Sequence, residues 1–299
     1  MKNPLVSITI TTKNEEKNIE NCLKSIRFQD YVPIEIIVVD NGSTDRTKEI
    51  AGKYTEKVLD KGPERSAQRN FGMIDHSEGK YAMYIDADMI LSPGLIAACV
   101  EAIQKNKYSA LHISEVVLGT NYFSKVRRFE RSFYDGTSID GARFFNREDF
   151  IKTGGFDLAL SGPEDWDMDK MIKKSGKIGL LKKATDPIAI EKWEQVSFIR
   201  ERGINPRNYG ECIFHNESEF DLKKYLSKKG YYAKSFDLYV RKWGKNDPDT
   251  RRQLGFFYRI LGVFLEHWKW VKLITHPILA AGMYFLRFLV GWMMITQKK

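Results

Sequence analysis

The sequence predicts an α/β protein built on a Rossmann-type, mostly parallel central sheet that is flanked by helices. Two observations favour this fold class. Short β-branched strands alternate with amphipathic helices, and polar clusters follow directly after several strands. The chain of 299 residues is long enough for one large domain or two smaller ones. Because 42% of the residues are hydrophobic and 29% are charged, the composition excludes a disordered chain.

The elements follow from residue type and hydrophobic period. Strands are predicted at 6–10, 34–39, 58–59, 81–85 and 141–145. Helices are predicted after Asn14, through Ile50 and Tyr54, around Arg65 to Asn70, at 95–103, at 147–153 and from Glu164 onward.

Two carboxylates, Asp86 and Asp88, stand where the fourth predicted strand leaves the sheet. Side chains at positions i and i+2 of a strand point to the same side, so both carboxylates can face one hard divalent cation. In open α/β sheets, ligands bind beyond the carboxyl ends of the strands. The alternative is a pair of solvated acids in a turn.

Polar clusters also follow the first two strands. Residues 11–15 follow the first strand and residues 40–43 follow the second, so both clusters should meet Asp86 at one edge of the sheet. An acid there can bind a base or a ribose, and the helix with Arg65 and Arg69 can approach phosphates. Ordinary turn chemistry is the alternative for the second cluster.

Four stretches in this order resemble the motifs of family 2 glycosyltransferases, which have the GT-A fold. The resemblance covers about the first two-thirds of the chain. It implies a nucleotide-sugar donor bound with a divalent cation, Mn²⁺ or Mg²⁺, at Asp86 and Asp88. The four stretches are Thr11-Thr12-Lys13-Asn14-Glu15-Glu16, Val38–Asp45, Arg65–Gly72 and Asp86-Ala87-Asp88. The donor-binding residues implied are Thr11, Lys13, Asn14, Glu15, Asp40, Asn41, Ser43, Arg65, Arg69 and Ala87.

Three positions depart from the usual family pattern. Lys13 stands where Tyr is common, Thr11 where Pro is common, and Asn41 where a second acid is common. All three fall near the expected base pocket, so GDP-mannose and UDP-sugars both remain open as donors.

The stretch Gly162-Pro163-Glu164-Asp165-Trp166-Asp167 resembles the acceptor-side acidic motif of the family. Without the resemblance, helix capping would explain these acids. With it, Asp165 is the expected general base of an inverting reaction, and Glu164 and Asp167 are its helpers or rivals.

A late histidine near the metal is common in the family, so the resemblance makes His215 a candidate third ligand; a structural histidine is the alternative. The stretch 186–208 is interpreted as an acceptor-specific insertion. Trp166 and Trp193 either stack on a sugar or pack in the interior.

The C-terminal part differs in character. Residues 220–299 carry 16 Lys and Arg against 5 Asp and Glu, a net charge of +11, whereas residues 1–219 carry −2. The basic and aromatic run 223–234 suits phosphates. Residues 256–268 predict one amphipathic interfacial helix, with core packing as the alternative. Residues 273–295 are long and apolar, but Pro277 and Arg287 favour a monotopic or re-entrant arrangement over a span.

Together these patterns predict a hexosyltransferase at the cytoplasmic face of a membrane, acting on a lipid-linked acceptor in polysaccharide or glycolipid biosynthesis. Residues 1–219 would form the catalytic domain, with a nucleotide-sugar half at 1–100 and an acceptor half at 101–219; residues 220–299 would associate with the membrane. The three cysteines form no C-x-x-C pair, which indicates a reducing compartment, and no signal peptide is expected.

Two alternatives remain from the sequence. A nucleotidyltransferase would need a glycine-rich phosphate loop after the first strand, and residues 11–16 contain no glycine. An RNA-binding protein would use the basic end, but it would leave Asp86, Asp88 and Asp165 unexplained; no nucleic-acid partner is therefore expected.

Overall fold

The computed structural model describes residues 2–233 and 235–296. A seven-stranded sheet has the order β3-β2-β1-β4-β8-β6-β9, with β8 antiparallel to both of its neighbours, and a small sheet has the order β5-β10-β7. The predicted α/β class is confirmed. The strands are β1 Val6–Thr12, β2 Ile34–Asp40, β3 Val58–Asp60, β4 Tyr81–Asp86, β5 Met89–Leu91, β6 Ala110–His112, β7 Glu115–Leu118, β8 Ala142–Asn146, β9 Ile178–Leu180 and β10 Ile213–Asn216.

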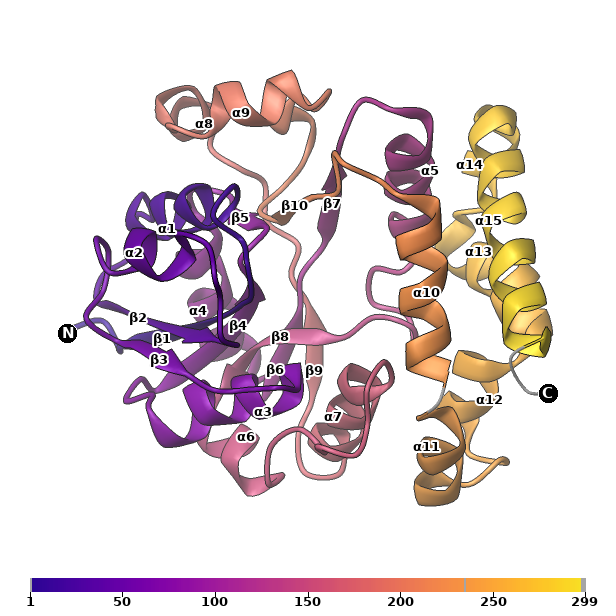
Figure 1. Cartoon of the computed structure of the whole chain (residues 1–299), viewed down its shortest axis with the longest axis horizontal. Helices are drawn as coiled ribbons and strands as arrows, with labels where there is room; N and C mark the ends of the chain where they lie inside the picture. The colour runs from indigo at the N-terminus through magenta and orange to yellow at the C-terminus, as the bar shows by residue number, and fades with distance from the viewer. Residues whose placement is uncertain (1, 234, 297–299) are drawn as a thin grey trace.

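Helices flank the large sheet and form a separate layer at the C-terminal end (Figure 1). The α-helices are α1 Ile19–Arg27, α2 Thr47–Ala51, α3 Arg65–Asn70, α4 Leu95–Asn106, α5 Tyr122–Arg131, α6 Arg147–Lys152, α7 Glu164–Lys173, α8 Pro187–Lys192, α9 Val196–Glu201, α10 Leu222–Ala233, α11 Phe236–Trp243, α12 Pro248–Leu254, α13 Val263–Leu265, α14 Val271–Thr275 and α15 Pro277–Thr296. The π-helical turns η1 Phe71–Asp75 and η3 Tyr258–Gly262 and the 3₁₀ turns η2 Pro206–Asn208 and η4 Glu266–Trp268 complete the set.

The strand register brings the predicted polar clusters to one edge of the large sheet. Strand β1 pairs in parallel with β2 and β4, so that Thr12 lies beside Asp40 and Thr11 lies beside Asp86. Both faces of β1 are fully buried, as Ile8 on one face and Thr9 on the other show. Burial on both faces fixes the register, because a slip of one residue would exchange the faces of the strand.

The small sheet positions the late histidine. Strand β10 is antiparallel to β5 and parallel to β7, and this pairing sets His215 opposite Met89, the residue after Asp88. The predicted insertion 186–208 forms α8, α9 and η2, which lie together beside the small sheet (Figure 1). Trp193 in this segment is 1% exposed and contacts the ring of Phe214, so it packs in the interior.

The C-terminal helices pack on α5. One apolar core contains Phe129 and Phe133 of the α5 region together with Phe264 and Met283. Figure 1 shows α11–α15 at the end of the molecule opposite β1–β3, with α5 and α10 between. This core therefore contains residues from both sides of the predicted domain boundary at 219/220.

The prediction of one continuous helix over 256–268 is wrong. Three short elements, η3, α13 and η4, cover most of it, and His267 and Trp268 have φ values of 55° and 61°. The left-handed conformation ends a regular helix, so the apolar residues of this stretch do not form one stripe. Phe264 is buried, whereas Phe256 and Phe257 are exposed.

The apolar stretch 273–295 is divided between α14 and α15, which are separated at His276. Within residues 2–233 and 235–296, the chain forms no helix that is both long enough and apolar enough to cross a membrane.

A buried histidine on β6 should make stability depend on pH. His112 Nε2 lies 2.6 Å from Asp169 Oδ2, and His112 Nδ1 lies 3.6 Å from Asp140 Oδ2. Burial opposes the charge, but the two carboxylates outweigh it and raise the pKa of His112 to about 9. Because the unfolded histidine has a pKa near ~6.5, its contribution should be full below that pH and lost as the pH rises through about 9.

We expect the free energy of unfolding to fall by on the order of 3 kcal/mol across this window because of His112. Urea unfolding between the two pKa values measures it. His112→Gln should remove most of the slope, and the exposed His276→Gln is the control. An unchanged slope in His112→Gln would show that other groups set the dependence.

Candidate functional site

The carboxylate of Asp86 lies at the centre of a charged cluster at the end of β4. Its Oδ1 accepts a hydrogen bond of 2.8 Å from the hydroxyl of Thr11. Arg65 and Arg69, both from α3, each lie 3.8 Å from Asp86. Burial alone would raise the pKa of Asp86, but Arg69, Arg65 and Arg143 hold it well below its usual range. Asp86 is therefore ionised at neutral pH.

The carboxylate of Asp165 lies in the same cluster, at the first turn of α7. Its Oδ1 accepts hydrogen bonds from Arg69 Nη1 at 2.9 Å and from the hydroxyl of Tyr84 at 2.8 Å. Arg69 is 1% exposed and stacks over the ring of Tyr84. The side chain of Asp165 is 27% exposed, so this oriented carboxylate remains accessible to a ligand.

The two neighbouring acids of the motif are buried. Glu164 is 4% exposed, lies 3.5 Å from Arg69, and has a pKa raised by burial and by Asp165. Asp167 is 1% exposed and points to the C-terminal helices, where it accepts hydrogen bonds of 2.9 Å from Lys242 and 2.7 Å from the indole of Trp243. Asp165 is thus the most accessible of the three carboxylates.

The loops after β1 and β2 are tied to each other. The backbone N–H of Asn14 donates to the hydroxyl of Ser43 at 2.8 Å, and Asn14 Oδ1 accepts from the N–H of Thr44 at 2.8 Å. Asn14 has a φ of 53°, a conformation that asparagine tolerates. Asp40 is buried and accepts from the N–H of Ser43 at 2.6 Å. These contacts order both loops before any ligand binds.

The other predicted donor residues line the same edge. Asn41 donates its amide to the carbonyl of Pro63 at 2.9 Å. The N–H of Ala87 bonds to the carbonyl of Thr11 at 3.2 Å. Burial raises the pKa of Glu15, with smaller contributions from Asp88 and Asp86. Lys13 is exposed in the loop after β1.

Asp88 has different partners from Asp86. Its Oδ2 lies 3.2 Å from His215 Nε2, while its Oδ1 is buried with no hydrogen-bond partner among the described residues. Burial disfavours the charged imidazole, but Asp88 outweighs it and raises the pKa of His215. Glu115 lies 3.7 Å from the other ring nitrogen. Asp88 Oδ2 and His215 Nε2 therefore lie next to each other, and Asp88 Oδ1 is left without a hydrogen-bond partner among the described residues.

Within residues 2–233 and 235–296, no group of three or more His, Cys, Asp or Glu side chains is arranged to hold a metal ion. Asp88 and His215 nevertheless fit a divalent cation that takes its remaining ligands from a substrate. Mg²⁺ in phosphate-transfer sites is commonly held in this way, by one or two carboxylates and substrate phosphates. Asp86, the other predicted ligand, contacts Thr11, Arg65 and Arg69, and its part in holding a cation stays a prediction.

Comparison with known proteins identifies the family. Residues 7–159 match the family described as Glycosyl transferase family 2, just over half of the chain. The protein is a family 2 glycosyltransferase. The predicted family and enzyme class are confirmed, and the nucleotidyltransferase and RNA-binding alternatives have no support from this finding.

This glycosyltransferase is also similar to two curated relatives. It is 24% identical to hyaluronan synthase from Pasteurella multocida over 85% of this chain and 29% of the relative. It is 23% identical to the GalNAc(5)-diNAcBac-PP-undecaprenol beta-1,3-glucosyltransferase of Campylobacter jejuni, over 79% of this chain and 64% of the relative. The chain thus spans less than two thirds of either relative.

Solved structures support the GT-A fold. The mannosyltransferase PcManGT from Pyrobaculum calidifontis, in complex with GDP-Man and Mn²⁺, superposes with a TM-score of 0.57 at 18% identity, over 98% of this chain and 85% of that chain. TarS 1-349 from S. aureus in complex with UDP-GlcNAc gives a TM-score of 0.52 at 16% identity, over 97% and 82%.

Some site residues of the glycosyltransferase were not predicted from its sequence. Tyr84, which binds Asp165, stands two residues before Asp86 on the same strand, so the period of two could have placed it on the same face. Glu115 and Arg143 form a buried ion pair near His215 and Tyr84. These residues lie on β7 and β8, which reach the site through pairing with strands that are distant in the sequence. Such pairing leaves no local pattern in the sequence.

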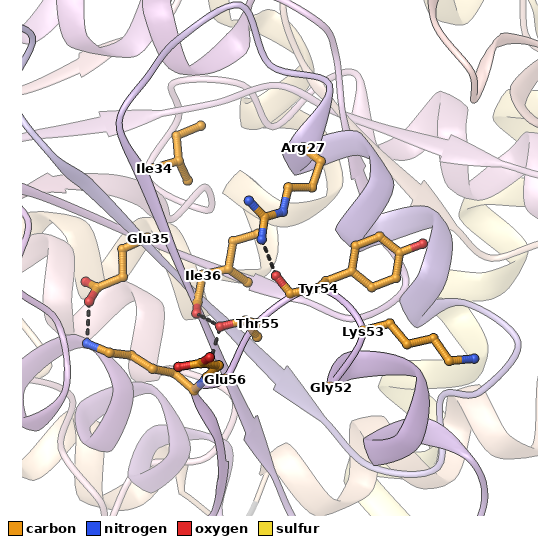
Figure 2. Close-up of a pocket in the computed structure, with 10 residues that line it drawn as sticks. Arg27, Ile34, Glu35, Ile36, Gly52, Lys53, Tyr54, Thr55 and Glu56 are labelled. Carbon is orange, nitrogen blue, oxygen red and sulfur yellow. Dashed lines mark hydrogen bonds and ion pairs between the residues drawn. The ribbon is translucent and has the colours of Figure 1, made fainter.

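The pocket in Figure 2 is separate from the glycosyltransferase site. It has a volume of about 470 Å³ and is lined by residues 34–36 of β2, by 52–57, and by Arg27. These residues lie at the start of β2, whereas Asp40 lies at its end. At this opposite edge of the sheet, the guanidinium of Arg27 donates a hydrogen bond to the carbonyl of Tyr54, and Lys57 forms an ion pair with Glu35.

Proposed function

We propose that this glycosyltransferase moves a hexose, with inversion, from GDP-mannose or a UDP-sugar to a lipid-linked glycan at the cytoplasmic face of a membrane. Residues 1–219 form the catalytic part and residues 220–299 the membrane-associating part. The likeness to structures that contain GDP-Man with Mn²⁺ and UDP-GlcNAc supports a nucleotide-sugar donor. The Campylobacter relative, whose name specifies an undecaprenol-linked substrate, supports the acceptor class.

The single observation that carries the proposal is the position of Asp165. Arg69 and Tyr84 hold one oxygen of its carboxylate, and the side chain stays partly exposed beside Asp86. A fixed carboxylate of this kind can take the proton of an acceptor hydroxyl while the new C–O bond forms at the anomeric carbon. The nucleoside diphosphate leaves from the opposite face of that carbon, which gives inversion.

The leaving group needs positive charge. Arg65 is placed to supply it from α3, and Asp88 and His215 would hold a divalent cation, Mn²⁺ or Mg²⁺. When bound, such a cation neutralises the departing diphosphate as a Lewis acid.

The C-terminal helices carry many exposed apolar side chains. The surfaces of soluble proteins seldom expose so many large apolar side chains. Together with the excess of basic residues in this part of the chain, these side chains support docking on an anionic membrane. The exposed residues are Phe256, Phe257, Leu261, Leu265, Trp268, Val271, Ile274, Ile278, Phe285, Phe288 and Trp292.

We expect the triple variant Phe256→Ser, Phe257→Ser, Trp268→Ser to bind phosphatidylglycerol vesicles at least about tenfold more weakly than the wild type. Each ring loses apolar burial worth about 1.5–3 kcal/mol when fully inserted. Co-sedimentation measures the binding. Substitution is preferable to truncation, because Phe264 and Met283 belong to a core shared with α5.

The control variant is Ile188→Ser, an exposed apolar residue on α8 outside the C-terminal helices. Its vesicle binding should match that of the wild type. Wild-type sedimentation of the triple variant would contradict membrane docking through this surface.

A panel of UDP- and GDP-sugars tests the transfer reaction directly. Each donor is incubated with the full chain, Mn²⁺ or Mg²⁺, and a native lipid extract, and label transferred to lipid is counted. One donor should give metal-dependent transfer to lipid. Failure of every donor, with proven folding, would overturn the proposed acceptor and donor classes.

A further inference from the structure

Four cations gather where α5, α10, η3 and α15 meet: Arg127, Lys229, Arg259 and Arg287, here called the cation cluster. Arg127 and Lys229 lie over the same ring, that of Tyr225, at 5.2 and 5.5 Å. Burial, then Arg127 and to a smaller extent Arg259 lower the pKa of Lys229 to about 7, although Glu130 opposes them. The four side chains therefore share one confined region.

The cation cluster has few counter-charges. Glu130 is buried and accepts from Arg127 at 2.6 Å and from Arg287 at 3.1 Å. Burial opposes its ionisation, but the two arginines hold the pKa of Glu130 at about 2. Glu217 is the second carboxylate, 3.3 Å from Arg127. Among residues 2–233 and 235–296, four basic side chains thus face two carboxylates.

Several donors of the cation cluster are unused. Among the described residues, the buried atoms Arg259 Nη1 and Arg287 Nη1 have no hydrogen-bond partner, although the side chain of Arg287 is only 9% exposed. Lys229 Nζ makes no hydrogen bond or ion pair within the same residues. Buried donors left unpaired are costly, and each needs an explanation. Excess charge and free donors together suit a multivalent anion.

The cation cluster adjoins the catalytic site on one side. Glu217 joins the two, because its Oε1 lies 3.8 Å from His215 while its Oε2 bonds to Arg127. On α10, Lys229 lies 6.0 Å from the ring of Tyr232, and the hydroxyl of Tyr232 accepts a hydrogen bond from Arg65.

The other side of the cation cluster adjoins the exposed apolar surface. Phe257 and Leu261 flank Arg259 in sequence and are 79% and 55% exposed. On α15, Phe285 and Phe288 are exposed while Arg287 between them points inward to Glu130 and Tyr134. An anion in the cluster would therefore have the sugar-transfer site on one side and an apolar surface on the other.

We propose that the cation cluster binds the phosphate or diphosphate that joins the lipid of the acceptor to its glycan. This inference rests on the proposed function, since it names the part of the lipid-linked acceptor that the chain holds. The lipid then lies along the apolar surface and the sugar reaches Asp165. The donor diphosphate has its own partners, Arg65 and the Asp88–His215 pair.

The probe is farnesyl diphosphate, and binding to the full chain is measured by isothermal titration. Lys229→Gln and Arg259→Gln should each weaken binding by about tenfold, because each removes a charge-assisted contact. Binding of free GDP and UDP with Mn²⁺ should not change. Neither side chain accepts or donates a side-chain hydrogen bond within the described residues, so both variants should fold, and melting curves check this.

Lys223→Gln is the matched control, an exposed lysine on the same helix, and its affinity should equal that of the wild type. Farnesol and phosphatidylglycerol vesicles separate the sources of binding. Farnesol should bind poorly, and co-sedimentation with the vesicles should be unchanged in Lys229→Gln and Arg259→Gln. A loss of vesicle binding in these variants as large as their loss of farnesyl diphosphate binding would reassign the cluster to membrane headgroups and overturn the proposal.

Two results overturn the proposal directly. The first is unchanged farnesyl diphosphate binding in both variants. The second is an equal loss of GDP and UDP binding, which would make the cation cluster part of the donor site. Variant-sensitive binding of farnesyl diphosphate without sugar transfer from any donor supports the cation cluster and rejects the proposed reaction instead. The two failures are therefore distinguishable.

Discussion

Replacing Asp165 with asparagine should reduce sugar transfer by about 10²–10⁴-fold while donor affinity stays close to that of the wild type. The amide keeps the size of the side chain and can still accept from Arg69 and Tyr84, but it cannot take a proton. The turnover number with donor and acceptor, and donor affinity by titration calorimetry, separate the chemical step from binding.

Glu164→Gln is the control, because Glu164 shares the contact with Arg69 but is buried. We expect a smaller loss of transfer in this variant. If Asp165→Asn transfers sugar at the wild-type rate and Glu164→Gln does not, Glu164 is the base. Asp167 is a poor candidate both for the general base and for a group that assists it, because its carboxylate is enclosed by Lys242 and Trp243.

The sequence predicted the donor half of the fold well because its signals are local. Strands β1, β2 and β4 are rich in β-branched and aromatic residues, and the helices between them show a clear buried face, as Cys22 and Leu23 do in α1. Parallel connectivity then required the polar strand ends to meet. The register of Thr11 beside Asp86 confirms that step.

The small sheet and the C-terminal helices could not be derived in the same way. Strands β5, β7 and β10 are three or four residues long and pair between segments that are about a hundred positions or more apart, so they lack a periodic signal. The break at His267 depends on backbone angles that apolar spacing does not encode. The same tertiary contacts pair Asp167 with Lys242, 75 residues away.

The same contrast between local signals and long-range contacts holds for the candidate site. Sequence order placed Asp86, Arg69 and Asp165 in one site, and the structure brings them together within ion-pair distance of Arg69. β4 ends at Asp86 and β5 begins at Met89, so the strand period of two does not apply between Asp86 and Asp88, and their joint binding of a cation stays a prediction.

Replacing Asp88 with asparagine should remove the dependence of donor binding on Mn²⁺ and lower transfer by at least about 10²-fold. Asp88 provides a buried carboxylate oxygen beside His215 that has no hydrogen-bond partner in the described part of the chain, which is where a cation would be held. The loss follows because a Lewis acid contributes several kcal/mol to a developing diphosphate charge. Calorimetric titration of GDP and UDP with and without Mn²⁺ measures the binding term.

A second readout does not need the reaction. Mn²⁺ that binds the native chain raises its melting temperature in the presence of the nucleotide, and this rise should disappear in Asp88→Asn. Asp60→Asn, at the end of β3 and paired with exposed Lys48, should keep the full rise. The same Mn²⁺-dependent shift in Asp88→Asn and in the wild type would place the cation elsewhere. Arg65 and Arg69 would then be the groups that neutralise the diphosphate, since both already lie beside Asp86 at the same sheet edge.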